Sequence, residues 1–343
     1  MDRNDCKATA ISRSAIAAIG VWFAVLAGPL GAPRMLVGAL PLIAVPTVAV
    51  STIALPTVAV ARDAPAAEAG ETAPKRSRAL SMASAEDVER TAAEQYEQLK
   101  RQAAAQRALA PADHPQLIRL RAISDRLIRQ ADRYNERAAS WKWEVNLIGS
   151  RQVNAFCMPG GKIAVYVGLL DQLKLTDDEI AIVVGHEIAH ALQEHGRERV
   201  GKMRLAQIGT VIASVGGALL GFGDLGGQVA SGAAQLTLLK YGREDETEAD
   251  TIGLDLAARA GFDPRAGLIV WEKMSAVAKG QPPQWLSSHP SHANRISEIA
   301  KQLDRVMPRY AAAVGKPLAA LPPYQSNVGK PIPWPLKVAT RGR

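Results

Sequence analysis

Residues 176–192 read TDDEIAIVVGHEIAHAL, which has the pattern of a capped and largely apolar helix. The hydroxyl of Thr176 can cap the first turn, and Glu179 three residues later completes a capping box. The apolar side chains that follow recur mostly at helical spacing. They are Ile180, Val183, Val184, Ile188 and Leu192. We therefore predict a helix that begins near Thr176 and packs in the core.

The same helix carries the pattern H-E-x-x-H at His186, Glu187 and His190. Positions i and i+4 of a helix differ by about 40° in direction and about 6 Å in height, so both imidazoles can reach one cation. Glu187 lies beside that cation and can take a proton from a water bound there. The pattern alone is weak evidence. However, burial of two histidines and a carboxylate on one helix costs folding free energy unless these groups have polar or metal partners. The context therefore predicts a catalytic zinc site.

The third zinc ligand is expected from a different segment, because catalytic zinc usually takes three protein ligands and one water. The candidate segment 244–250 reads EDETEAD, which is also typical of a solvated acidic helix start. Within it, Glu246 and Asp250 stand four residues apart on one helix face. One of them can bind the metal while the other orients a ligand imidazole. Spacing alone leaves open which residue has which role.

The composition favours a helix-rich globular fold. Of the 343 residues, 48% are apolar, 22% are charged and only 5% are aromatic. The net charge of +8 is dispersed without a long Lys/Arg block, which argues against nucleic-acid binding. We therefore expect an α+β fold that is mostly helical. Helices are expected over 85–109, 115–138, 241–260, from Asp263-Pro264 onward and over 292–306, and strands over 141–148 and 162–167.

The N-terminal residues 1–61 have the pattern of an export signal. Two apolar runs follow a polar start, and Ala59-Val60-Ala61 has the small-x-small form of a signal peptidase site. A retained membrane anchor is the alternative, although the first apolar run is short for a stable span. The prediction is an exported protein of the periplasm, with membrane attachment as the other option.

The rest of the chain divides by composition. The almost uncharged, Gly-rich stretch 204–222 is long enough to span a membrane, but a buried helical hairpin is the favoured interpretation. The expected organisation is a signal peptide or N-terminal membrane anchor over 1–61, a linker over 62–84, a zinc metallopeptidase domain over 85–310 and a Pro-rich C-terminal tail over 311–343.

Over about 115–305 the chain resembles a family of zinc metallopeptidases. This family includes the CaaX prenyl proteases, the heat-shock membrane protease HtpX, the mitochondrial Oma-type protease, and periplasmic members such as BepA and LoiP. The resemblance implies a zincin-like domain of the gluzincin type with a small β-sheet beside the H-E-x-x-H helix. One departure is Gly242, where relatives usually have serine. Four blocks carry the resemblance: 154–161 with 168–170, 185–190, 243–250 with Gly253, and 288–290 with Arg295-Ile296.

The resemblance also implies roles for individual residues. It places the glutamate ligand four residues before the aspartate, which maps to Glu246 as the third metal ligand and to Asp250 as the residue that orients a ligand. Asn154 and Ala155 resemble the edge strand along which such enzymes align the substrate backbone.

The late residues His289 and Arg295 match a histidine and an arginine that lie near the metal in such enzymes. There they hold the oxyanion or occupy the open coordination position, so we expect catalytic roles for both beside Glu187. The implied cofactor is one Zn²⁺ per chain. The implied activity is zinc-dependent endopeptidase cleavage in protein quality control of the bacterial envelope.

The expected substrates are unfolded or misfolded envelope proteins, with membrane or outer-membrane assembly partners and no nucleic acid. A rival interpretation is a zinc-binding envelope chaperone or assembly factor in which His289 plugs a latent site. Two other rivals are an integral-membrane protease and a helical scaffold without metal.

Overall fold

We describe a computed structural model of the chain, which covers residues 77–205, 241–278, 284–289 and 294–336. The leader expected over 1–61 and nearly all of the stretch expected as a hairpin lie outside the described residues. Among the described residues, no helix is long and apolar enough to cross a membrane. The elements, with η for 3-10 helices, are η1 (Arg78–Met82), α1 (Ala85–Ala105), α2 (Pro115–Ile128), η2 (Ala131–Arg133), η3 (Glu136–Ser140), β1 (Glu144–Ile148), β2 (Ala155–Met158), β3 (Lys162–Tyr166), α3 (Val167–Leu173), α4 (Asp177–Leu192), α7 (Arg243–Arg259), α8 (Ala266–Val277), α9 (Gln284–Ser288), α10 (Arg295–Ala313) and η4 (Leu318–Ala320).

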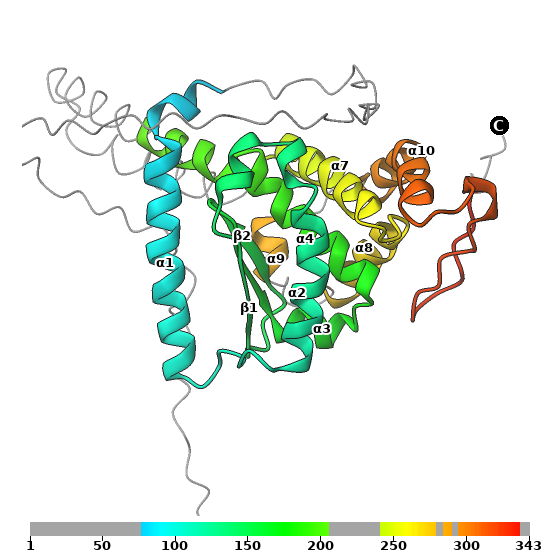
Figure 1. Cartoon of the computed structure of the whole chain (residues 1–343), viewed down its shortest axis with the longest axis horizontal. Helices are drawn as coiled ribbons and strands as arrows, with labels where there is room; N and C mark the ends of the chain where they lie inside the picture. The colour runs from blue at the N-terminus through cyan, green and yellow to red at the C-terminus, as the bar shows by residue number, and fades with distance from the viewer. Residues whose placement is uncertain (1–76, 206–240, 279–283, 290–293, 337–343) are drawn as a thin grey trace, which may run out of the picture. The chain divides into compact units, whose positions relative to one another are not determined.

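Three short strands form a mixed sheet in the order β1-β3-β2 (Figure 1). β1 runs parallel to β3, and β2 runs antiparallel to it with Ala155 opposite Val165. β2 is therefore an edge strand of the sheet. The expected fold class, α+β and mostly helical with a small sheet, is confirmed.

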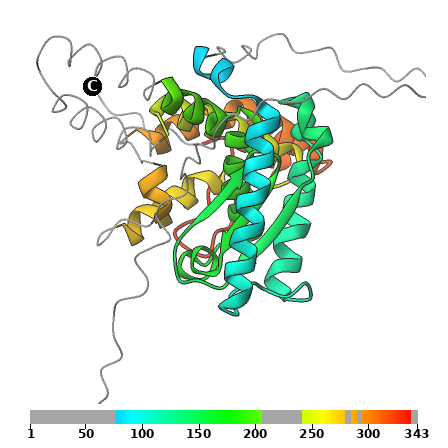
Figure 2. The ribbon, with the colours of Figure 1, turned by 90° about the vertical axis from the view of Figure 1, so that its left-hand side faces the viewer.

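Helices cover both faces of the sheet. α1 crosses one face, as Figure 2 shows, and α2 and α4 pack on the other. Tyr96 fixes α1 to the sheet, because its buried hydroxyl donates to the carbonyl of Ile163 and accepts from the side-chain amide of Asn146 at 3.2 Å. The sheet therefore lies between a surface helix and the helix that bears the H-E-x-x-H pattern.

α4 is the central helix of the domain. Its residues from Glu179 to Leu192 are all buried, and the predicted capping box is present. The amide of Glu179 donates to the hydroxyl of Thr176 at 3.3 Å, and the amide of Thr176 donates to the Glu179 carboxylate at 2.9 Å. The predicted start and buried position of this helix are confirmed.

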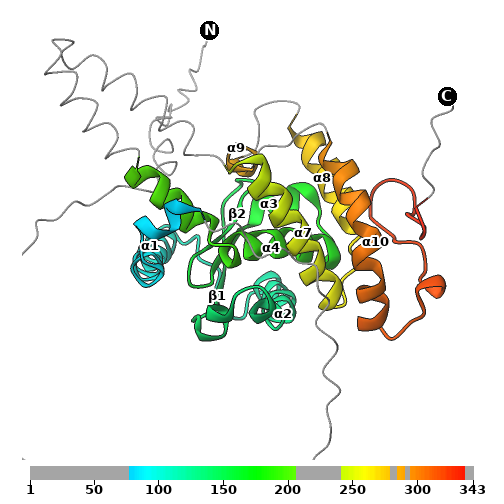
Figure 3. The same ribbon diagram turned by 90° about the horizontal axis from the view of Figure 1, so that it is seen from above.

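α7 packs against α4 backbone to backbone and also contacts α10, while α8 packs against α4 and α10 (Figure 3). A Cβ atom on Gly185 would lie 2.9 Å from the carbonyl oxygen of Gly253, and one on Gly253 would lie 2.8 Å from the amide nitrogen of His186. Real Cβ atoms do not approach so closely, so both positions require glycine. This contact sets the distance between the two segments that carry the candidate metal ligands.

Two later helices differ from the expected boundaries. α8 begins at Ala266 rather than beside Asp263, because the first turn has i→i+3 bonds from Ala266 to Asp263 and from Gly267 to Pro264. The carboxylate of Asp263 still caps this turn by accepting from the amide of Arg265 at 3.0 Å. α10 continues to Ala313, beyond the expected end at 306, because its apolar stripe continues past that point.

The C-terminal segment packs on the domain and is tied to it by two buried cations. Arg265 donates to the carbonyls of Pro322 at 2.8 Å and Ile332 at 3.0 Å. Lys273 donates at 2.6 Å both to Glu179 and to the side chain of Asn327. The expected tail therefore forms part of the folded body through residue 336. At the other end, η1 occupies the last part of the expected linker.

Candidate metal centre

Four side chains from three segments converge at one point. His186 and His190 come from α4, and Glu246 comes from α7. His289 follows directly after α9. One ligand atom of each lies within 4.8 Å of the others, and all four residues are buried. Nε2 of His186 lies 3.1 Å from Nε2 of His190 and 3.3 Å from Nδ1 of His289.

The chemistry of this group fits a divalent metal ion. Nδ1 of His186 lies 3.0 Å from the Asp250 carboxylate, which can only accept, so a ring with one proton carries it on Nδ1 and has a lone pair on Nε2. That lone pair faces His190 and the Glu246 carboxylate, and buried acceptors that face each other are unfavourable without a cation. Tetrahedral zinc with bonds of about 2.0–2.1 Å would separate its ligand atoms by about 3.3–3.4 Å. The distances from Nε2 of His186 to His190 and Glu246 are 3.1 and 3.6 Å.

Arg295 holds the carboxylates of Glu246 and Asp250 in place. It donates to Glu246 at 2.5 Å and to the two oxygens of Asp250 at 2.7 and 2.8 Å. Its guanidinium also lies 3.6 Å above the ring centroid of Trp271, and the residue is 1% exposed. The resemblance led us to expect Arg295 near the metal, and in the structure its guanidinium binds the carboxylates of Glu246 and Asp250.

The second α4 imidazole has a partner that sequence reasoning missed. Nδ1 of His190 lies 2.9 Å from Nδ1 of His195, and Nε2 of His195 lies 3.1 Å from the carboxylate of Glu248. Tyr241 stacks on the His190 ring with centroids 3.9 Å apart. Glu248 was visible in the acidic segment 244–250, but the pattern there is also that of a solvated helix start.

Glu187 lies beside the ligand group and is 3% exposed. Its Oε1 accepts a hydrogen bond of 2.6 Å from the indole of Trp285 and lies 3.5 Å from Nε2 of His289. Trp285 stacks on His289 with centroids 4.9 Å apart. The indole therefore fixes the orientation of the carboxylate, a contact that no motif in the sequence signals.

The electrostatics of the site favour ligand forms of these groups. Burial opposes ionisation of Glu246, but the surrounding imidazoles of His190 and His289 outweigh it and hold the pKa of this carboxyl well below its usual range. Burial lowers the pKa of His190 far below its usual value, so the ring is neutral. Burial likewise opposes ionisation of Asp250, but the Arg295 charge lowers its pKa overall. Neutral imidazole and ionised carboxylate are the forms that bind metals.

The edge strand β2 lies next to this centre. The carbonyl of Asn154 accepts from the amide of Tyr166, so Asn154 and Phe156 form hydrogen-bonded pairs with β3. In an antiparallel pair the alternate residues direct their backbone groups away from the partner strand. Ala155 therefore directs its N–H and C=O away from β3, as does Val153, whose carbonyl accepts from the amide of Trp285 at 3.2 Å. Ala155 itself is 2% exposed.

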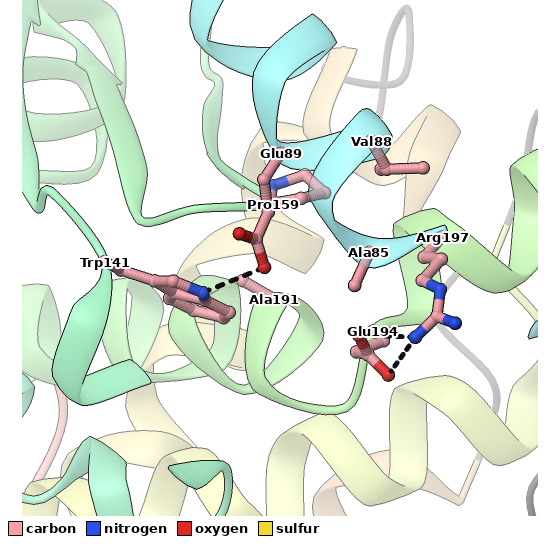
Figure 4. Close-up of a pocket in the computed structure, with 8 residues that line it drawn as sticks. All are labelled: Ala85, Val88, Glu89, Trp141, Pro159, Ala191, Glu194 and Arg197. Atoms are coloured by element: carbon pink, nitrogen blue, oxygen red, sulfur yellow. Dashed lines mark hydrogen bonds and ion pairs between the residues drawn. The ribbon is translucent and has the colours of Figure 1, made fainter. Parts of the chain in front are cut away.

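A separate small cavity lies between α1 and the end of α4 (Figure 4). Its acidic groups already have partners. Glu89 accepts from the indole of Trp141 at 3.0 Å, and Glu194 accepts from Arg197 at 2.9 Å. The cavity is thus a packing gap at a helix contact, and the metal centre remains the candidate functional site.

The comparisons with known proteins agree with this geometry. Residues 116–303 match Peptidase family M48. Metalloendopeptidase OMA1 of Bos taurus is 37% identical over 177 residues, which cover 49% of this chain and 33% of that protein. The beta-barrel assembly-enhancing protease of Yersinia pestis is 29% identical over 178 residues, which cover 49% of this chain and 36% of that protein.

Metalloprotease LoiP of Escherichia coli (strain K12) is 29% identical over 198 residues, which cover 57% of this chain and 73% of that protein. The chain spans about a third of the length of the cattle and Yersinia relatives, at 33% and 36%. The family match covers more than half of the 343 residues and includes all four converging side chains. The chain therefore belongs to Peptidase family M48.

Proposed function

We propose that this chain is a zinc-dependent endopeptidase with His186, His190 and Glu246 as its metal ligands. The observation that carries the proposal is the convergence of three buried side chains, whose ligand atoms lie 3.1 to 3.6 Å apart, beside the carboxylate of Glu187. Two imidazoles with one carboxylate form a common ligand set of catalytic zinc. Family membership supports the same activity.

The reaction assigned to the site is peptide hydrolysis. A bound Zn²⁺ supplies Lewis acidity, which lowers the pKa of a water and polarises the scissile carbonyl. Glu187 accepts the proton of the attacking water and passes it to the leaving amine. The bond from Trp285 holds Oε1 of Glu187, which limits rotation of this carboxylate during both transfers.

Asp250 and Arg295 act on the ligands in this proposal. Asp250 fixes the His186 ring through Nδ1, and Arg295 fixes the carboxylates of Glu246 and Asp250. Because its nitrogens already donate to these carboxylates, Arg295 is a positioning residue and is poorly placed to hold an oxyanion. This assignment replaces the catalytic role expected from the resemblance.

The substrate backbone is assigned to the outer edge of β2, with which no further strand of the described residues pairs. Ala155 directs its N–H and C=O away from β3 but is 2% exposed, so an extended peptide can add there as a further strand only when the residues that cover Ala155 move aside. Asn154 can contribute only through its side chain, because its backbone carbonyl is used within the sheet. This mode recognises backbone and favours unfolded segments, as a quality-control protease requires.

His289 favours a second, related candidate function. Its Nδ1 lies 2.9 Å from Glu246 and 3.3 Å from His186, so it can serve as a fourth ligand where a water is needed. In that state the chain would be a zinc-binding chaperone or assembly factor with a plugged site. Zinc binding without cleavage in wild type, and equally without cleavage in His289→Ala, would favour this candidate. Cleavage that appears only in His289→Ala would identify a latent protease.

The proposed setting is the bacterial envelope, with misfolded envelope proteins as substrates and membrane or outer-membrane assembly factors as partners. The names of the Yersinia and E. coli relatives support a protease and, in one case, a link to β-barrel assembly. The signal-peptide pattern of residues 1–61 supports export to the periplasm. The mass of the mature N-terminus, together with carbonate extraction of membranes, tests cleavage of the leader against retention as an anchor.

The direct test compares wild type with Glu187→Gln. We expect about one zinc per chain in both proteins by metal analysis, and cleavage of an unfolded substrate such as casein by wild type only. Glu244→Gln is the matched control, because Glu244 is an exposed acid in the first turn of α7. It should retain both zinc and cleavage. Equal cleavage by wild type and Glu187→Gln would reject the assigned base.

A further inference from the structure

The two α4 imidazoles of the centre are held in different ways. Nδ1 of His186 meets a carboxylate directly, that of Asp250. Nδ1 of His190 meets another imidazole, that of His195, at 2.9 Å. His195 is 4% exposed and lies beyond the end of α4, so it belongs to a different segment from the ligand that it contacts. Only one proton can lie between these two nitrogens, so one ring must donate and the other must accept. The buried position of His195 therefore restricts which nitrogen of His190 carries its proton.

When each ring carries one proton, one set of tautomers satisfies the whole chain of contacts. If Nε2 of His190 binds a metal, its remaining proton is on Nδ1, which then donates to Nδ1 of His195. His195 must accept there, so as a neutral ring it has its own proton on Nε2. That Nε2 lies 3.1 Å from the carboxylate of Glu248, which accepts a hydrogen bond from it. With one proton on each ring, every polar atom of this chain therefore has a partner when Nε2 of His190 is free to bind the metal.

We propose that His195 and Glu248 form a positioning relay that selects the metal-binding tautomer of His190 and fixes its ring. This inference rests on the proposed zinc site and assigns to it two residues outside the ligand set. Tyr241 holds the same ring from its face, with centroids 3.9 Å apart and an interplanar angle of 25°. Arg199 lies 4.6 Å from the centroid of the Tyr241 ring, which fixes the stack from outside.

The outer end of the relay differs from that of His186. Asp250 is closed off by Arg295 inside the protein, whereas the side chain of Glu248 is 36% exposed. A carboxylate that orients a metal ligand usually contributes 10- to 100-fold in metal affinity. Here Glu248 acts on His190 only by way of His195. We therefore expect His195 to account for most of this gain in zinc affinity, and the solvent-screened Glu248 for less.

Zinc affinity of the full chain, measured by competition with a chromophoric chelator, tests the relay. His195→Leu removes the acceptor, and we expect its zinc Kd to rise about 10- to 100-fold. His195→Asn has a carboxamide oxygen near the position of Nδ1, so it should restore the Kd to within about fivefold of wild type. Glu248→Gln should raise the Kd only about two- to fivefold, and the control Glu244→Gln should leave it unchanged.

Two further readouts separate positioning from packing. Co²⁺-loaded His195→Leu should show a shifted visible spectrum, because the ligand field depends on the orientation of His190. The melting temperature of each metal-free variant reports packing alone. Equal losses of zinc affinity in His195→Leu and His195→Asn, with equal falls in metal-free melting temperature, would overturn the relay. So would a His195→Leu variant that binds zinc like wild type. Failure of wild type itself to bind zinc would instead refute the proposed function.

Discussion

The close contact between α4 and α7 makes Gly253→Ala the most informative single substitution. The added Cβ would lie 2.8 Å from the amide nitrogen of His186, against about 3.4 Å for ordinary contact, an overlap of about 0.6 Å. It would also lie 3.0 Å from the carbonyl carbon of Gly185. All of these atoms are backbone, so no side chain can rotate away and the two helices must separate.

The size of the effect follows from two opposing terms. Overpacking of this kind costs about 1–3 kcal/mol, and the better helix propensity of alanine returns up to about 1 kcal/mol. A net loss of about 1–2 kcal/mol corresponds to a fall in melting temperature of about 2–8 °C for a domain of this size. Separation of the helices also moves Glu246 away from the two imidazoles. Sites of this kind tolerate displacements of only about 0.5 Å, so we expect at least a tenfold loss of zinc affinity.

The assay measures thermal unfolding and zinc Kd for Gly253→Ala beside a matched control. Gly267→Ala also places alanine inside a helix, but its Cβ would meet the ends of flexible side chains, at 3.1 Å from Leu254 and 3.4 Å from Ile299. This control should bind zinc like wild type and melt within about 3 °C of it. If both variants behave alike, the helix contact does not set the ligand geometry and our reasoning is wrong.

Three further predictions concern the buried charges and the metal. Lys273→Met leaves the fully buried Glu179 without its cation and should destabilise the fold by about 3–5 kcal/mol in denaturant unfolding, while adding Glu179→Gln should recover part of the loss. No recovery would mean that the loss comes from packing. Burial and the nearby Asp263 carboxylate raise the pKa of Asp178 from 3.8 to about 6, so the folded state binds this proton more tightly than the unfolded state. Stability from this group is therefore fully present below about pH 4 and is lost as pH rises through about 6. Asp178→Asn should gain stability relative to wild type over that window, and a constant difference across it would contradict the assignment. Removal of metal by a chelator should lower the melting temperature of wild type but not of Glu246→Gln, with recovery on addition of Zn²⁺; an unchanged wild type would argue against a bound metal.

Local signals in the sequence were sufficient to predict the position of the central helix α4 and the side chains that it contributes to the site. The capping box at Thr176 and the buried apolar spacing fix where α4 begins, and the H-E-x-x-H pattern then fixes which side chains share a face. Spacing could not decide between Glu246 and Asp250, because both lie on the same face of α7. The structure separates them by distance, with Glu246 among the ligand atoms and Asp250 on the outer nitrogen of His186.

The remainder of the site depends on tertiary packing that no local pattern encodes. His195 stands five residues after His190, a spacing that does not share a helix face. Glu194 has a positive φ of 58°, which ends the helix and turns His195 back toward His190. Trp285 reaches Glu187 from a short helix far along the chain, and β2 was expected only through a family resemblance. The short helix α3 was missed because a seven-residue helix gives too little periodicity.

The attachment of the C-terminal segment has a consequence for the order of events during synthesis. The two cations of this attachment, Arg265 and Lys273, are translated some fifty or more residues before the acceptors that they meet at Pro322, Asn327 and Ile332. Arg265 can already pair with Asp263, and Lys273 with Glu179, so both cations have a carboxylate partner before those acceptors emerge. The carbonyl and amide contacts around α8 are completed only after residues 322–332 have been translated.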